Sequence, residues 1–582
     1  MQRPSFLKRG GALLFYLLLF LFFAAPVLRL ISMSLRIPGG WGLAKFQVLF
    51  QDPRTLEAVR NTLFISLCSA GLSTFLGTAL GFLMAYTDLR HKKLLELLIL
   101  LPFIIPSYII TLSWSGLFLQ DGRINLFLWG LGFAGVNLYT RGGILFVLGI
   151  VNMPVVYLSV IHFLRKIPVD LDLAARSCGF SSWETWRRID LKEALPAIAA
   201  GGLLAFLAAM DNFAVPAFLG ISSNITVLST MIYEKAIGMG PGAFPAAAGL
   251  SVVLSCLALG GTLLESGLVS SQSALESIQE SREPRIYFRP AVRIGVEGGL
   301  FLVLGLLDLV PLLDMMINAF LKNYGLPATA DNFSWENFQF VFSSTGVMDA
   351  LETSLLLASA AGAICLVAGA ICLVAGTLIA YWKLRRHSLA ALLAERGAAL
   401  AYALPGIVLA LAEIFHWTEP LPGIKPGIYG TMWLLLIAYV TRYMILQIKG
   451  STNALLAINP ELEDAVLASG RDWRTLWRQV LLPLLLRPCV ASTALIFISA
   501  LTELTLSSML ASAGTRTIGL AIFNFQQAGD YNLAAALSTL ITSLILGGYG
   551  LTWLEDLHKK GNRKYEFVSG THQSAVREDT GA

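Results

Sequence analysis

Twelve long apolar stretches constrain the fold of this chain more than any other feature of its sequence. Each is long enough for a helix that crosses a bilayer, which takes about 20 apolar residues. With 56% hydrophobic and only 14% charged residues among 582, the chain is too apolar for an ordinary soluble protein. Backbone groups in lipid must pair within their own segment, so we expect an all-α polytopic membrane protein. The stretches cover roughly residues 11–31, 62–86, 94–119, 143–163, 194–219, 244–266, 295–320, 352–381, 397–415, 429–447, 485–511 and 533–554.

Lysine and arginine predict which ends of these spans face the cytoplasm. With the N-terminus inside and twelve crossings, the cytoplasmic segments hold most of the 42 basic residues, as the positive-inside rule requires. Both termini are then cytoplasmic. The net charge of +5 follows from this topology, and no nucleic-acid partner is expected. The apolar N-terminal run is interpreted as an uncleaved first span, because removing it would invert every later loop.

One short stretch occurs twice, 291 positions apart, in the expected cytoplasmic segments 164–193 and 448–484. Each copy has acidic residues where a first helix begins, a glycine where a left-handed cap would end that helix, and a second short helix. Tryptophan and arginine on these helices would form an exposed knob for a soluble partner, although an ordinary amphipathic loop is the alternative. The identical pairs are Leu171/Leu462, Ala174/Ala465, Gly179/Gly470, Trp186/Trp477, Arg187/Arg478 and Leu191/Leu482.

Local helix signals support this interpretation of both copies. Ser181 and Glu184 have capping-box spacing in the first copy. In the second copy Asp472 is expected to cap the second helix, and Pro483 is suited to the start of the next one.

The repeat extends to two homologous six-helix halves with parallel topology, because six crossings return the chain to the same side. Residues 46–50 before the second span match residues 338–342 before the eighth. Such a duplication predicts a pseudo-two-fold pathway along the membrane normal. We expect a first half at 1–266, a cytoplasmic linker at 267–294, a second half at 295–555 and a polar tail at 556–582. An immediate seven-residue repeat at 363–376 carries no functional hypothesis.

The repeated loop resembles the EAA motif of permease subunits of binding-protein-dependent ABC importers, in which Glu-Ala-Ala precedes Gly and a later Leu-Pro. The second copy has aspartate for glutamate and valine for one alanine, and its matching residues are Asp464, Ala465, Val466, Gly470, Leu482 and Pro483. The first copy has leucine for glutamate and Lys192 where the proline belongs, and its matching residues are Leu173, Ala174, Ala175 and Gly179.

This resemblance implies a type I, MetI-like fold in the bacterial inner membrane. It also implies that both loops, with Trp186, Arg187, Trp477 and Arg478, couple to two copies of a cytoplasmic ABC ATPase. A periplasmic or lipid-anchored binding protein would deliver the substrate. The segments 211–220 and 503–508 look most like those of ferric iron permeases, with thiamine, polyamine and aminoalkylphosphonate permeases as the alternatives.

The chain contains no Gly-x-x-x-x-Gly-Lys-Ser/Thr phosphate loop and no clustered Cys and His set. We therefore expect a transport subunit and not an enzyme, with no firmly assigned metal site, and with ATP and Mg bound by the partner ATPase. An ion-coupled secondary transporter is the alternative from another class. It would also show two parallel halves, but it would not need matched cytoplasmic loops.

Candidate translocation residues lie in the spans that follow the two loops. Residues 211–216 near the end of the fifth span align with residues 503–508 in the eleventh at a displacement of 292, so that Asp211 matches Glu503. The candidates in these two segments are Asp211, Asn212, Glu503 and Thr505. A carboxylate at this depth is costly unless it faces water or a partner, so it is a default site candidate. A purely structural role is the alternative, in which these groups satisfy freed backbone or bond between helices.

Overall fold

The computed structural model describes residues 20–37, 40–119, 122–238, 243–270, 281–324, 329–363, 389–419, 426–512 and 514–548, with a few further residues outside these ranges. Helices dominate this part of the chain, which confirms the all-α prediction. Its two short strands, β1 (Arg36–Ile37) and β2 (Gly40–Trp41), form one antiparallel pair in which Arg36 faces Trp41. The predicted tail at 556–582, residues 271–280 of the linker and most of the tandem repeat at 363–376 lie outside the described residues.

The first half consists of long helices joined by short ones, with π-helical segments named η. Its helices are η1 (Phe20–Ala24), α2 (Ala25–Leu35), α3 (Ala44–Gln51), α4 (Pro53–Tyr86), α5 (Lys92–Ile104), α6 (Ser107–Leu117), α7 (Arg123–Gly130), α8 (Arg141–Lys166), α9 (Val169–Ser177), α10 (Ser182–Thr185), η2 (Trp186–Asp190), α11 (Leu191–Asp211), α12 (Ala214–Gly220), α13 (Leu228–Ile237) and α14 (Ala243–Ser270).

The second half repeats this order, including a short amphipathic helix before its second span, so that α17 corresponds to α3. Its helices are α15 (Pro290–Leu304), η3 (Gly305–Leu309), α16 (Val310–Ala319), the 3₁₀ turn η4 (Ala330–Asn332), α17 (Glu336–Ser343), Thr345–Ala363, α19 (Leu389–Ala403), α20 (Gly406–Thr418), α21 (Met432–Leu456), α22 (Pro460–Ala468), α23 (Trp473–Thr475), η5 (Leu476–Leu481), α24 (Leu482–Leu501), α25 (Thr505–Leu510), α26 (Ile518–Ala528) and Tyr531–Gly548.

The helices account for the predicted spans. Eight are long and apolar enough to cross a membrane, three further spans are bent helix pairs, and Phe20–Leu35 is a shorter apolar helix. Each of the twelve predicted ranges overlaps one of these, so the count of about twelve agrees with the described residues.

The continuity predicted for the third and ninth spans was wrong. The chain bends by 100° between α5 and α6 and by 114° before α20. Pro106 and Pro405 stand at these bends, immediately before the new helices begin. Proline has no N–H to donate and forces the preceding residue towards an extended conformation, which ends the first helix.

The fifth and eleventh spans are also broken. The fifth divides into α11 and α12 around Asn212, whose backbone is extended, and the eleventh divides into α24 and α25 around Thr502 to Leu504. Both breaks therefore fall at the predicted acidic positions.

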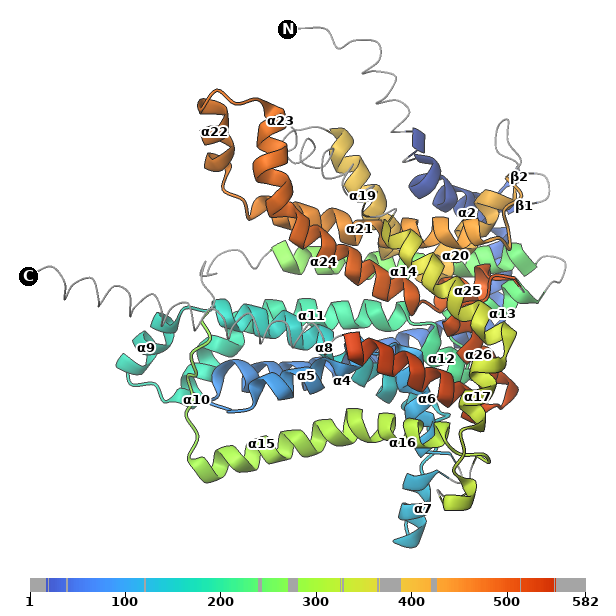
Figure 1. Ribbon diagram of the computed structural model, residues 1–582, viewed down its shortest axis with the longest axis horizontal. Coiled ribbons are helices and arrows are strands. Elements are labelled where there is room, and N and C mark those ends of the chain that lie inside the picture. The colour runs from blue at the N-terminus through green and yellow to red at the C-terminus, as the bar shows by residue number, and fades with distance from the viewer. Residues whose placement is uncertain are drawn as a thin grey trace, which may run out of the picture.

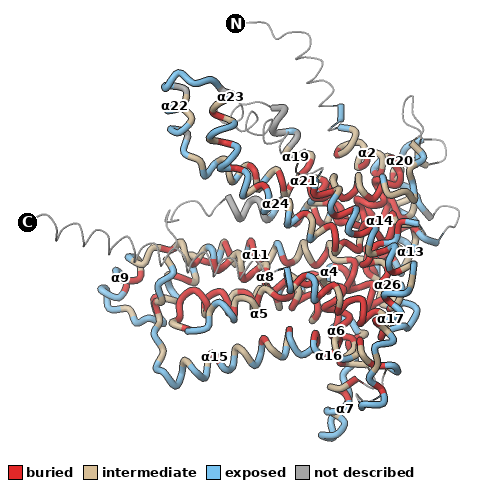
Figure 2. The backbone as a smooth tube through the Cα atoms, viewed as in Figure 1, coloured by how far each residue is buried: buried red, intermediate tan, exposed pale blue. Residues whose placement is uncertain are grey.

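The long helices run side by side, and the loop helices α9, α10, α22 and α23 all lie at one end, hereafter the loop end (Figure 1). The strands, α13 and α26 lie at the opposite end. Burial is concentrated towards that opposite end, whereas the loop helices are largely exposed (Figure 2).

The first span of each half packs against the other half. Helix α2 contacts α20, and Arg29 on α2 donates to the carbonyl oxygens of Phe415 and His416. In return α16 contacts α6, and α15 contacts α5. Arg123 at the start of α7 forms an ion pair with Asp314 of α16. The two halves are therefore interlocked through the core and not merely side by side.

Candidate functional site

The first repeated loop folds as a helix, a glycine turn and a helix, as the sequence predicts. Helix α9 has two aspartates in its first turn, and Gly179 has a φ of +87°, which non-glycine residues rarely adopt. Ser181 and Glu184 form the predicted capping box at the start of α10. The glycine therefore turns the chain sharply and the box starts the second helix, which continues through η2 into α11.

The second loop has the same construction. Gly470 has a φ of +76° after α22, and Asp472 accepts a hydrogen bond of 3.0 Å from the backbone N–H of Thr475. Pro483 lies in the first turn of α24. The two loops thus present matching turns at one end of the molecule (Figure 1).

Most of the predicted coupling residues are on the surface of these loops. Within each motif the third position alone turns inward, because Ala175 is 5% exposed and Val466 packs against the small core below its loop. The exposed members are Leu173, Ala174, Gly179, Arg187, Asp464, Ala465, Gly470, Arg478, Leu482 and Pro483.

The prediction of exposed tryptophans at Trp186 and Trp477 was wrong. Trp186 is half-buried, with its ring 5.5 Å from that of Phe82 on α4, and Trp477 is half-buried against its own local core. The exposed aromatic residue is Trp183, which is 63% exposed and stacks on Trp186 at 4.5 Å. The repeated tryptophans therefore anchor the loops to the spans. Trp183 lies one helical turn earlier on the same face, where it covers Trp186 and stays exposed itself.

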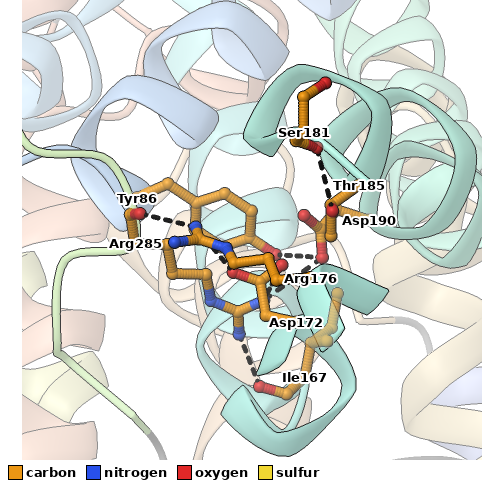
Figure 3. A network of polar contacts seen from close by, with 8 residues as sticks. All are labelled: Tyr86, Ile167, Asp172, Arg176, Ser181, Thr185, Asp190 and Arg285. Carbon is orange, nitrogen blue, oxygen red and sulfur yellow. Dashed lines mark hydrogen bonds and ion pairs between the residues drawn. The ribbon is translucent and has the colours of Figure 1, made fainter. Parts of the chain in front are cut away.

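A buried arginine from the linker ties the first loop to the first half (Figure 3). Arg285 is 8% exposed, and its guanidinium lies 3.2 Å from Asp190 of η2 and 4.0 Å from Asp172 of α9. It also donates to the carbonyl oxygen of Ile167 at 2.7 Å and lies over the ring of Tyr86 at 4.3 Å. One side chain thus contacts the end of α4 and both ends of the loop.

The linker backbone completes this clamp. The N–H groups of Arg285 and Ile286 both donate to the carbonyl oxygen of Tyr86, and Arg176 of α9 donates to the carbonyl oxygen of Arg285. Farther along, Asp88 accepts from the N–H of Phe288. The sequence indicated only a polar linker here, and no local pattern marks Arg285 for burial, because its partners are about 100 residues away.

The predicted pathway residues line a single cavity of ≈ 380 Å³ between the two halves. Its walls come from the α5–α6 and α11–α12 breaks of the first half and from α21 and the α24–α25 break of the second. The two prolines before α6 and at the end of α5 also face it. Asp211, Asn212, Glu503 and Thr505 are all among its lining residues.

The four predicted residues have different hydrogen-bond partners. The Asn212 side chain accepts from the N–H of Val215 at 3.0 Å and so caps α12. The Glu503 carboxylate accepts from the N–H groups of Leu506 and Ser507 at 2.8 and 3.3 Å, at the start of α25. Thr505 begins that helix. The structural roles weighed in the sequence analysis are therefore present, in residues that also face the cavity.

Asp211 has a partner that the sequence analysis missed. Its carboxylate accepts from the N–H of Gly406, which opens α20, and forms an ion pair of 2.5 Å with Arg442 of α21. Arg442 also donates to the carbonyl oxygen of Leu404 at 2.7 Å. An arginine within an apolar span is costly in lipid, and that signal could have identified Arg442 from the sequence.

These loops and this cavity can be compared with known proteins. The model of the family described as "Binding-protein-dependent transport system inner membrane component" matches residues 77–266 and 340–563, and so covers most of the chain in two copies. The chain belongs to this family. The permease is accordingly a membrane transport subunit and not an enzyme, and the ion-coupled secondary transporter is excluded.

Two curated relatives match the permease along most of its length. The Fe(3+)-transport system permease protein FbpB 2 of Haemophilus influenzae is 23% identical over 87% of this chain and 91% of that protein. The ferric transport system permease protein FbpB of Actinobacillus pleuropneumoniae is 23% identical over 94% of this chain and 78% of its own.

Other relatives match the permease over a shorter part. The sulfate transport system permease protein CysT of Escherichia coli is 28% identical over 44% of this chain and 89% of that protein. A solved chain of a bacterial alginate ABC transporter, in complex with a periplasmic protein that holds an alginate pentasaccharide, is 19% identical. It covers 46% of this chain and 96% of its own, with a TM-score of 0.38.

Proposed function

We propose that this permease forms the translocation pathway of an importer for ferric iron. A binding protein, periplasmic or lipid-anchored, delivers the substrate to the end that carries α13 and α26. Two copies of an ABC ATPase, which hold ATP and Mg, dock on the loop end. Both chain termini and both loops are then cytoplasmic, and the bilayer surrounds the long helices.

The observation that carries this proposal is the pairing of two matched loops at one end with one carboxylate-lined cavity between the halves. Each loop presents a short helix and a left-handed glycine turn, which fits one ATPase subunit per half. The cavity is lined by residues of both halves, so that alternating rotation of the two halves would expose it to each side in turn.

The charges of the cavity support a cationic substrate. Its lining contains two carboxylates, Asp211 and Glu503, and one guanidinium, Arg442, so the described lining has a formal charge of −1. Carboxylate oxygens are hard ligands of the kind that ferric iron prefers. A sulfate-like anion fits this lining less well. The two relatives named as ferric permeases, which match most of the chain, agree with this choice.

Uptake in cells tests the substrate. Accumulation of radiolabelled ferric iron in iron-starved cells should fall when the gene is deleted and recover with the intact gene. Excess thiamine, putrescine, an aminoalkylphosphonate or sulfate should leave it unchanged. Unaltered iron uptake in a deletion strain without another importer would refute the iron assignment, and competition by one of the four compounds would name the substrate instead.

Co-purification tests the partners. The permease in mild detergent should retain an ATPase subunit at two copies per chain, measured by the mass of the complex. A stable complex with one copy, or ATPase that still binds after both Gly179 and Gly470 are replaced by valine, would contradict docking at both loops.

A further inference from the structure

The pseudo-two-fold symmetry of the cavity is broken at one position. Asp211 and Glu503 occupy equivalent breaks in the two halves, but Arg442 aligns with Val151, 291 positions earlier. Both of these residues line the cavity. The first half therefore offers Glu503 no arginine that corresponds to the one paired with Asp211, and the cavity has one ion pair where symmetry would give two.

This ion pair joins the halves. Asp211 ends α11 of the first half, whereas Arg442 and the N–H of Gly406 belong to the second half. The guanidinium is held from behind by the Leu404 carbonyl oxygen and lies 5.6 Å from the ring centre of Tyr402. The Arg442 side chain is 11% exposed, so most of its water has been replaced by these contacts. The second half thus presents a preorganised cation to a carboxylate of the first.

An aromatic layer closes the cavity on the side away from the loops. Phe213 immediately precedes α12 and Phe218 lies within it, and both contact Phe523 of α26 at ring separations of 6.2 and 5.4 Å. Tyr233 of α13 lies 6.3 Å from the same ring. Phe213, Phe218 and Phe523 are 0%, 2% and 3% exposed. These three rings are almost fully buried, so they fill the space between the halves on this side of the cavity.

The two pairs of loop helices lie farther apart than the short helices at the opposite end. Figure 1 shows α9 and α10 well separated from α22 and α23, while α12, α13, α25 and α26 are packed together at the opposite end. The Asp211 side chain is still 37% exposed. This exposed part of Asp211 lies at the cavity. In the orientation of the proposed function, on which this inference rests, the aromatic layer closes the cavity to the outside.

We propose that the Asp211–Arg442 ion pair is the latch of an outer gate, which is closed in this structure and breaks when the pathway opens outward. The aromatic layer of Phe213, Phe218, Tyr233 and Phe523 is the seal above it. Breaking the latch leaves Arg442 on the Leu404 carbonyl and frees Asp211, so that two carboxylates, one from each half, face an arriving cation. In the closed gate the Asp211 carboxylate is therefore paired with Arg442, and in the open gate it is available to the cation.

Thiol labelling in intact spheroplasts tests the latch without any transported substrate. All six cysteines are replaced, and a single reporter cysteine is placed in the cavity by Thr502→Cys. A membrane-impermeant thiol reagent is added outside. Labelling should be slow in the parent and at least tenfold faster in Arg442→Gln and in Asp211→Asn. The exchanged pair Asp211→Arg with Arg442→Asp should return to within threefold of the parent rate.

Matched variants separate the latch from general damage. Arg141→Gln removes an exposed ion pair with Glu57 inside the first half, 2.8 Å long, and should leave the labelling rate of the reporter unchanged. A reporter at the exposed outer turn, Ser222→Cys, should label at the same rate in every background. If Arg442→Gln does not accumulate in the membrane, Arg442→Lys replaces it. The expected rise is then at least threefold, because the shorter lysine has one nitrogen in place of the two that bond Asp211 and the Leu404 carbonyl oxygen.

The outcomes discriminate between the proposals. Unchanged cavity labelling in both single variants, with normal labelling at Ser222→Cys, would overturn the latch. An exchanged pair as fast as the singles would also overturn it, because the charges would then act separately. Failure of iron uptake would refute the proposed substrate and leave the labelling result standing.

Discussion

Removal of the Arg285 side chain should release the first loop from the membrane-spanning helices. The perturbation is Arg285→Met, which keeps the length of the side chain and removes its charge. It leaves Asp190, 3% exposed, without the guanidinium 3.2 Å away. Breaking a buried ion pair from one side costs about 3–5 kcal/mol. Tyr86 and Arg176 still contact the two aspartates, so we expect the lower end, near 3 kcal/mol.

A loss of about 3 kcal/mol of local stability should let the first loop open more often. Because about 1.4 kcal/mol is a factor of ten, the open population should rise roughly 100-fold. Amide hydrogen exchange measured by mass spectrometry reports such local opening directly. Peptides from 167–190 should exchange about 100-fold faster in the variant, whereas peptides from 458–481 of the second loop should not change. ATP-dependent uptake should fall in parallel.

Two further variants test whether the charge of Arg285 holds the first loop. Arg289→Met, in the same segment but exposed, should exchange like the wild type. The double variant Arg285→Met with Asp190→Leu removes both buried charges and puts at 190 the leucine that Leu481 supplies in the second loop. It should exchange more slowly than the single variant. Unchanged exchange at 167–190 in a folded Arg285→Met protein, or a double variant faster than the single, would refute the clamp.

Three other changes have defined outcomes. Gly470→Val should reduce uptake and ATPase co-purification, because valine is strained at a φ of +76°. Gly470→Asn should retain most of both. Equal loss in the two variants would contradict a requirement for the left-handed turn. Asp472→Ala should weaken the cap of the second helix, which would be seen as faster exchange in 472–476. The hydroxyl and N–H of Thr475 donate to Asp472 and lower the pKa of its carboxyl. This cap is therefore complete above the ordinary aspartate pKa and is lost as the pH falls through the lower folded value. Exchange in 472–476 that does not respond to acid beyond its intrinsic pH dependence would contradict this role of Asp472. Asp211→Asn should abolish net uptake while ATPase still co-purifies, and normal uptake would remove Asp211 from the pathway.

The loops were predictable because their signals are local and repeated. Glycine, capping and acidic residues at fixed spacing specify each turn without knowledge of the rest of the fold, and duplication 291 positions apart made chance unlikely. The acidic candidates could also be found, since charge in an apolar span stands out. The breaks at Pro106 and Pro405 carried a local signal that a count of apolar residues overlooks.

What sequence could not provide was the pairing of distant residues. Arg442 and Asp211 are 231 positions apart, and Arg285 and Asp190 are 95 apart. Periodicity describes how one helix is buried, but it does not say which helix covers it. For the same reason the sequence predicted an exposed Trp186, whereas the ring of Phe82 from another helix covers it.

Because the first span of each half packs against the other half, α2 must wait during synthesis for a partner that is made much later. Helix α2 leaves the ribosome long before α20, because the Phe415 carbonyl oxygen that accepts from Arg29 is 386 residues later in the chain. At about 5–20 residues per second, α2 waits roughly 20–80 s for that partner. During this time the carbonyl partners of Arg29 on α20 do not yet exist, and its guanidinium must be kept out of the hydrocarbon by lipid headgroups, water or the insertion machinery. A nascent chain that stalls before α20 would therefore leave α2 in the membrane before these carbonyl oxygens are made, and quality-control proteases can recognise such a helix.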